Sequence, residues 1–179
     1  VYPLLPDGSV VAAVTNGLSN QAMAVKAEHG QPATFELQFD GDKPKGIRRE
    51  VIQYFHDCTE DLARFLHHAA WAPLAGNFTI DAHQTYPWDR PAVEGTPWKN
   101  PLFLPPIVAH HHAFRFEVDG EAGSLLWLVP ISDAEQLHIA RHGLEALLDR
   151  MAEVQLSWIF DAAARPGLVD SSGTQNRNF

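Results

Sequence analysis

Two histidines with helical spacing offer the clearest candidate chemistry in the chain. His138 and His142 lie four residues apart, and Glu135 lies three residues before the first of them. Because side chains at positions i and i+4 of a helix are neighbours, both imidazoles could reach one metal ion, as they do in zinc sites. A zinc protease helix reads H-E-x-x-H, but position 139 is isoleucine. The pattern therefore favours exposed or structural histidines, and a metal-dependent hydrolase is the alternative.

Other short patterns carry weaker chemical signals. The run His110-His111-His112 falls in an expected strand, where neighbours point to opposite faces, so at most two of the three could converge on one ion. We interpret it as a polar strand end that would add ligands only in the hydrolase alternative. His67 and His68 close an expected helix, where a cation favours the helix dipole. The segment at 17–21 reads GLSNQ, which lacks the second glycine of the hydrolase elbow G-x-S-x-G, and it predicts a turn.

A long proline-rich segment is the strongest candidate for contact with another protein. Residues 83–106 contain six prolines together with Tyr86, Trp88 and Trp98. A loop of this length is usually functional or held by its own side chains. Exposed tyrosine and tryptophan dominate binding hot spots, and prolines reduce the entropy lost on docking. We predict that these three aromatic residues bind a partner; the alternative is that their rings fold back into a small core.

Hydrophobic periodicity predicts the elements that position these residues. A helical period from Ile47 to Trp71 predicts one long helix with Cys58 in its buried stripe, which Pro73 and Gly76 end. Alternation predicts three strands, at 34–40, 77–82 and 114–118. The apolar run at 125–129 predicts a strand buried on both faces, paired with the preceding strand as a hairpin.

The segment after this hairpin predicts two helices and completes the fold. Pro130 should end the strand because it donates no hydrogen bond, Ser132 and Glu135 match a capping box, and Gly143 should divide the following apolar stripe into two helices. These elements together predict an α+β fold with a mixed, mostly antiparallel central sheet flanked by helices (α/β/α sandwich). We expect a single domain over residues 1–165 and a polar tail over 166–179 that docks on another surface.

Composition and charge narrow the class of protein. The 179 residues carry 13 Lys plus Arg against 22 Asp plus Glu, a formal net charge of −9, which disfavours nucleic acid and would steer a basic partner. One cysteine favours a reducing compartment, and no apolar run approaches the roughly 20 residues of a membrane helix. Because no secretory leader and no nucleotide motif is visible, we predict a cytoplasmic protein with a protein partner, no cofactor, and no nucleic-acid or membrane contact.

Several short motifs, taken in order, resemble the Suppressor of Fused domain family. An apolar strand ends in PISDAE at 130–135, like the family's P-I-[ST]-x-x-E, and the next helix carries GLEALL at 143–148, like G-L-x-x-L-L. The segment TNGLS at 15–19 resembles the family's T-x-G-L-S element. The similarity spans most of residues 10–155, and the order of the motifs is the stronger signal.

This resemblance implies a mixed α/β sandwich without catalytic residues that binds another protein. Animal members restrain a transcription factor and use an extra carboxy-terminal domain. Because 179 residues are too few for that domain, we expect the chain to resemble the compact bacterial members. Those members imply an immunity-type role, in which the protein occludes a toxin domain. We therefore expect an immunity-type or sequestering protein with a basic, toxin-like partner. A third hypothesis is that the protein is a scaffolding subunit.

Overall fold

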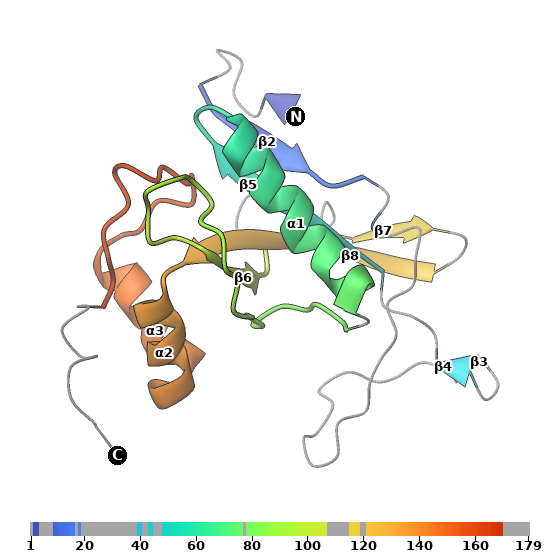
Figure 1. The fold of residues 1–179 in the computed structure, drawn as a ribbon. Coiled ribbons are helices and arrows are strands. Elements are labelled where there is room, and N and C mark those ends of the chain that lie inside the picture. Colours follow the sequence, from blue (N-terminus) through green and yellow to red (C-terminus); the bar gives the residue numbers. More distant parts are fainter. Residues whose placement is uncertain are drawn as a thin grey trace.

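One mixed sheet of six strands forms the centre of the computed structural model, which describes residues 2–3, 9–16, 18, 39–40, 43–44, 48–76, 78–106, 115–118 and 121–169. Its strand order is β1 (Tyr2–Pro3), β2 (Val11–Val14), β5 (Arg48–Phe55), β8 (Glu121–Ile131) and β6 (Asn100–Leu104), and β7 (Arg115–Val118) also pairs with β8. Figure 1 shows β8 as the long curved strand that joins the two halves of this sheet. A separate short pair consists of β3 (Phe39–Asp40) and β4 (Lys43–Pro44).

The strand directions confirm the expected mixed and mostly antiparallel sheet. β5 runs parallel to β8, with Ile52 opposite Trp127, whereas the other neighbouring strands in this sheet are antiparallel. β7 and β8 form the hairpin predicted from the alternation at 114–118. Both long strands are needed for the fold because each of them carries side chains to both layers of the core.

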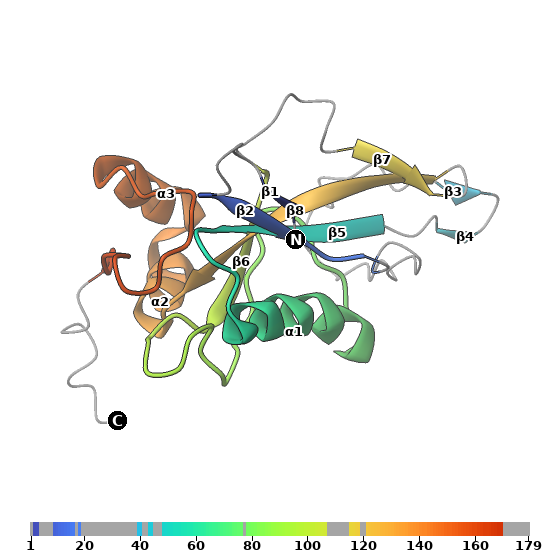
Figure 2. The same ribbon diagram turned by 90° about the horizontal axis from the view of Figure 1, so that it is seen from above.

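Helices cover both faces of the sheet, which confirms the predicted sandwich. Val51 and Phe55 point from β5 into the core beneath α1 (Glu60–Gly76), whereas Ile52 and Tyr54 point into the core beneath α3 (Leu144–Glu153). This alternation follows from the period of two in a strand. Figure 2 shows α1 on one side of the sheet and α3 on the other, with α2 (Asp133–His142) beside α3.

The single helix expected from Ile47 to Trp71 is wrong in its first half. Residues 48–55 form β5, whose side chains are buried on both faces apart from half-buried Arg49, and the helix begins only at Glu60. Burial on both faces removes the polar alternation by which a strand is recognised. The apolar positions of the strand then matched a helical period by coincidence. Thr59 lies before the helix, where its hydroxyl accepts from the Leu62 amide at 3.4 Å.

Four smaller expectations are also corrected. No strand covers the described part of 77–82, which follows an irregular path. Pro130 does not end β8, which continues to Ile131 with Pro130 opposite Pro101 in the ladder. Cys58 lies in the turn before α1 and is half-buried. Pro73 is inside α1, which ends at Gly76.

The local signals near the second pair of helices are confirmed. Ser132 and Glu135 form the reciprocal capping box at the start of α2. Gly143, at φ 86°, separates α2 from α3, and this left-handed conformation is one that glycine adopts without strain. The run His110–His112, the predicted strand at 34–40 apart from Phe39–Asp40, and residues 170–179 lie outside the described residues. In the part of the chain that is described, no helix has the length and apolar character needed to cross a membrane.

Candidate functional site

The proline-rich loop packs against α1 through two of its predicted aromatic residues. The Tyr86 hydroxyl donates to the Ala69 carbonyl at 3.0 Å, and burial raises the pKa of this hydroxyl well above its usual range. Trp88 is half-buried, and its ring centroid lies 6.2 Å from that of Tyr86 and 5.9 Å from that of His68. These contacts fix the loop along α1 at the edge of the core, against which both rings pack.

Trp98 lies deeper than the other two rings. It is 4% exposed, and its indole Nε1–H donates to the Ala162 carbonyl at 3.2 Å. The Arg165 guanidinium stacks over the ring at 4.6 Å, a favourable arrangement of a cation over an aromatic face. The structure thus brings Tyr86 and Trp88 together at α1 and places Trp98 in the core beneath the loop. The partner-binding role of the three rings stays a prediction.

A polar hollow of about 330 Å³ separates the start of α1 from the loop. Phe65 and Pro91 line it together with charged side chains of both signs and His68: Asp61, Arg64, His68, Arg90 and Glu94. Burial lowers the pKa of His68, and electrostatic repulsion from the neighbouring His67, Arg90 and Arg64 lowers it further. Arg64 is already paired with Glu60 at 2.8 Å and Asp61 at 3.1 Å. This mixture of charges offers no uniform site for an anion or a cation.

On the other side of α1, an apolar groove of about 480 Å³ opens against the β2 end of the sheet. Its lining comes from β2, the segment after it and α1: Ala13, Val14, Thr15, Asn16, Leu18, Cys58, Ala63, Leu66, His67, Ala70, Trp71 and Leu74. Trp71 is 55% exposed, which is the largest exposure among the large hydrophobic side chains described. Burial raises the pKa of the Cys58 thiol, so this cysteine is a poor nucleophile at neutral pH. The groove can therefore receive an apolar side chain, and its described lining residues offer no activated nucleophile.

Sequence reasoning missed the importance of Trp71. The hydrophobic period places Trp71 only at the end of the predicted helix, and the exposure of its ring depends on where β2 lies relative to α1. The signal in the sequence is a tryptophan at the end of an apolar stripe. Because tryptophan is often buried in such a position, this signal does not by itself indicate an exposed ring. Three-dimensional packing, which brings residues 13–18 alongside the helix, is what leaves this ring at the rim of a groove.

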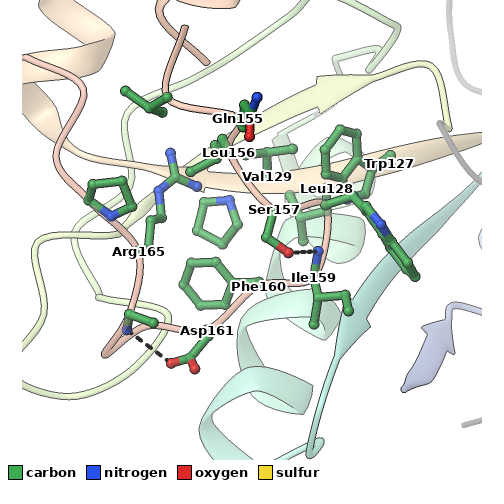
Figure 3. A pocket seen from close by; sticks show the side chains of 15 residues that line it. Trp127, Leu128, Val129, Gln155, Leu156, Ser157, Ile159, Phe160, Asp161 and Arg165 are labelled. Atoms are coloured by element: carbon green, nitrogen blue, oxygen red, sulfur yellow. Dashed lines mark hydrogen bonds between the residues drawn. The ribbon is translucent and has the colours of Figure 1, made fainter. Parts of the chain in front are cut away.

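A third hollow, of about 240 Å³, lies between β8 and the chain that follows α3. Figure 3 shows Trp127, Leu128 and Val129 on one side of it, with Phe160 and Arg165 on the other. The segment that encloses it is held in place by Phe160, whose amide donates to the Tyr54 carbonyl at 2.8 Å. Arg165 is nearly buried. Desolvation lowers the pKa of its guanidinium, and the negative charge of Glu135 partly offsets this shift. Because these residues contact their own chain, we interpret the hollow as a packing gap beneath the segment that follows α3.

The histidine pair is close in space, but Glu135 is not available to it. The ring centroids of His138 and His142 lie 4.6 Å apart. Glu135 is fully buried, and its carboxylate accepts from the Ser132 amide at 2.8 Å and from the Leu168 amide at 3.2 Å. Among the described residues, no group of three or more His, Cys, Asp or Glu side chains could hold a metal ion. The three-residue centre of the hydrolase alternative is therefore not assembled from His138, His142 and Glu135.

The fold and these surfaces define an α+β sandwich domain whose helix α1 lies between an aromatic loop and an apolar groove. The sequence profile of the Suppressor of fused protein (SUFU) family matches residues 1–163. The chain belongs to this family, which confirms the resemblance seen in its motifs. A search of curated proteins found no match.

Solved structures share the fold. A SUFU homologue from Neisseria gonorrhoeae FA 1090 superimposes with a TM-score of 0.56 at 20% identity, over 69% of this chain and 64% of that one. The Sufu–Fu complex gives 0.55 at 11% identity, over 74% of this chain and 62% of that one. Drosophila Suppressor of Fused gives 0.54 at 11% identity, over 74% and 34%. The matched region thus spans less than two thirds of each of these chains, and the similarity is one of fold.

Proposed function

We propose that this chain is a non-catalytic protein-binding module that sequesters a partner protein by covering its functional surface. Membership of the SUFU family supports this proposal, because one solved structure with the same fold is a complex, named Sufu–Fu. The chemistry of the described residues agrees with it. Cys58 has a raised pKa, and Glu135 is committed to its own chain.

The observation that carries the proposal is exposed Trp71 at the rim of the apolar groove. Tryptophan is among the residues that contribute most to binding, and such anchors work best beside a pocket that excludes water. The groove supplies this pocket through Leu18, Leu66 and Leu74. A partner that inserts an apolar side chain there would also contact the Trp71 ring. Half-buried Trp88, which the loop holds beside His68 on the other side of α1, provides a second contact point in our proposal.

The partner we propose is a basic protein of the toxin type, bound as by an immunity protein. The net charge of −9 supports a basic partner, since opposite charges raise association rates and exclude acidic competitors. The mechanism is steric: the bound module covers the partner's active surface and needs no chemistry of its own. Protein-binding modules of this kind require a rigid face, and α1 is fixed by the hydrogen bond from Tyr86 to Ala69.

The test begins with native mass spectrometry of the untagged protein isolated gently from its own source lysate. We expect a one-to-one complex with a basic protein. The purified partner is then titrated with wild type, Trp71→Ala and Trp88→Ala by calorimetry. Loss of a central hot spot costs about 2 kcal/mol or more, so the dissociation constant should rise roughly 30-fold for Trp71→Ala and less for the half-buried ring.

Leu137→Ala and Val154→Ala are matched controls, because both side chains are exposed hydrophobics on other parts of the surface. They should bind the partner as wild type does. If Trp71→Ala and Trp88→Ala bind equally well while a complex exists, the face is wrong and the binding role stands. If the isolated protein carries no partner at any stoichiometry, the sequestering role itself is contradicted.

A further inference from the structure

We propose that His138 and His142 form a two-imidazole site for a divalent transition-metal ion of the Zn²⁺ and Ni²⁺ type, with water completing its coordination. This site is independent of the binding surface on α1, and it involves no hydrolysis. Imidazole is the protein ligand that zinc, copper and nickel share. An ion held by two side chains one turn apart would cross-link the last turns of α2.

The geometry of the pair suits such an ion. The two ring centroids lie 4.6 Å apart and the ring planes are tilted by 42°. Zinc–nitrogen bonds of about 2.0–2.1 Å place two ligating nitrogens no more than about 4 Å apart. A centroid separation of 4.6 Å is compatible with this distance between ligating nitrogens. The backbone of α2 need not change, since positions i and i+4 already share one face.

An unpartnered nitrogen is the second observation that points to a ligand. Nε2 of His138 is buried and has no hydrogen-bond partner, although buried polar atoms are nearly always paired. His142 is exposed, so an ion between the rings would keep open positions for water. A metal bond would satisfy the nitrogen that the protein leaves unpaired.

The charges around the pair predict a modest affinity. Glu135 cannot add an anionic ligand, because Ser132, Arg165 and Leu168 occupy its oxygens. Arg150 of α3 is close enough for its positive charge to act on His138, and this charge opposes a bound cation. Removing this charge should therefore tighten metal binding, whereas a purely structural pair of histidines would not respond to metal at all.

The experiment titrates metal-free, untagged full-length protein with Zn²⁺ and, separately, Ni²⁺. The background carries His110→Gln, His111→Gln and His112→Gln, so that this run cannot supply ligands. Calorimetry gives the affinity, and the imidazole ¹⁵N resonances identify the ligands. We expect one ion per chain, with the signals of His138 and His142 shifting together. His138→Gln and His142→Gln should each weaken binding by about tenfold or more, judging from the 10–100-fold losses seen when even outer partners of a metal ligand are removed.

His67→Gln is the matched control, because His67 and His68 lie at a similar ring separation of 5.7 Å but in adjacent positions of α1. It should bind metal as the background does. Arg150→Gln should bind more tightly. Binding of Zn²⁺ should also raise the melting temperature, and this rise should vanish in His142→Gln. Unchanged affinity in both His138→Gln and His142→Gln, or no binding in the background protein, would overturn the site.

Discussion

Glu135 and Arg165 form an ion pair across thirty residues, with Nη2 of the guanidinium 3.5 Å from Oε2 of a carboxylate that is fully buried. The same carboxylate caps α2 through the Ser132 amide and accepts from the Leu168 amide. One side chain therefore starts a helix and anchors the chain that follows α3. The position belongs to the motif P-I-[ST]-x-x-E, and the structure gives that motif a physical role.

Glu135→Ala should destabilise the protein by about 3–5 kcal/mol, the typical loss when one partner of a buried ion pair is removed. The reason is that the Arg165 side chain, which is only 4% exposed, would be a buried charge without a counter-charge. In addition, two backbone donors would lose their acceptor. Urea unfolding measured by circular dichroism gives the free energy of unfolding. Limited proteolysis should show faster cleavage after Glu153, where the anchored segment begins.

Ser132→Ala is the control that separates the two roles of Glu135. It removes the hydroxyl that accepts from the Glu135 amide at 3.2 Å, and it should cost only about 1 kcal/mol, as N-cap substitutions do. Its proteolysis pattern should match wild type. Equal losses for Glu135→Ala and Ser132→Ala would show that the ion pair adds nothing to the cap.

Gly123→Ala should destabilise the β7–β8 hairpin by about 1–3 kcal/mol, the usual penalty of overpacking. Gly123 lies opposite Phe116 in the ladder, and a Cβ at this position would overlap the ring carbons of Phe116. The measurement is again the free energy of unfolding. Gly167→Ala is a matched control, because no heavy atom lies within 4 Å of its Cβ position. A loss as large in Gly167→Ala would refute the steric explanation.

Structural features that depend on interactions over a few residues could be predicted from the sequence. The capping box at Ser132 depends on a spacing of three, and the break at Gly143 depends on one residue's conformational freedom. The hairpin could be predicted because the residues of β7 alternate and only two residues separate β7 from β8. In each case the deciding interaction lies within one element or between sequence neighbours, so tertiary packing does not override it.

The features that the sequence did not reveal depend on distant contacts. The sequence predicts a helix at β5 because both faces of this strand are buried, and only the positions of α1 and α3 explain that burial. Trp98 was expected at a binding surface, yet its indole is covered by a segment 64 residues further along the chain. Trp71 is likewise exposed because the apolar groove lies open between α1 and β2. A better signal for β5 was its density of β-branched and aromatic residues between Val51 and Phe55.

His68 should make the stability of the protein depend on pH through its contact with Trp88. The folded state lowers the pKa of His68 from its usual 6.5, first because of burial and then because of electrostatic repulsion from His67, Arg90 and Arg64, which Asp89 partly offsets. As pH falls below 6.5, the unfolded chain takes up a proton at this residue that the folded chain refuses. Stability is therefore lost between pH 6.5 and the lower folded pKa, and the loss is constant below it.

Trp88→Ala should move the pKa of His68 up towards 6.5, because the indole ring 5.9 Å away contributes to the burial of this imidazole. Titration of the His68 ring protons by NMR measures the shift directly. Leu137→Ala, which removes an exposed side chain from α2, should leave that titration unchanged. An unaltered His68 pKa in Trp88→Ala would mean that the charges on α1 and the loop, rather than the aromatic contact, keep this imidazole neutral.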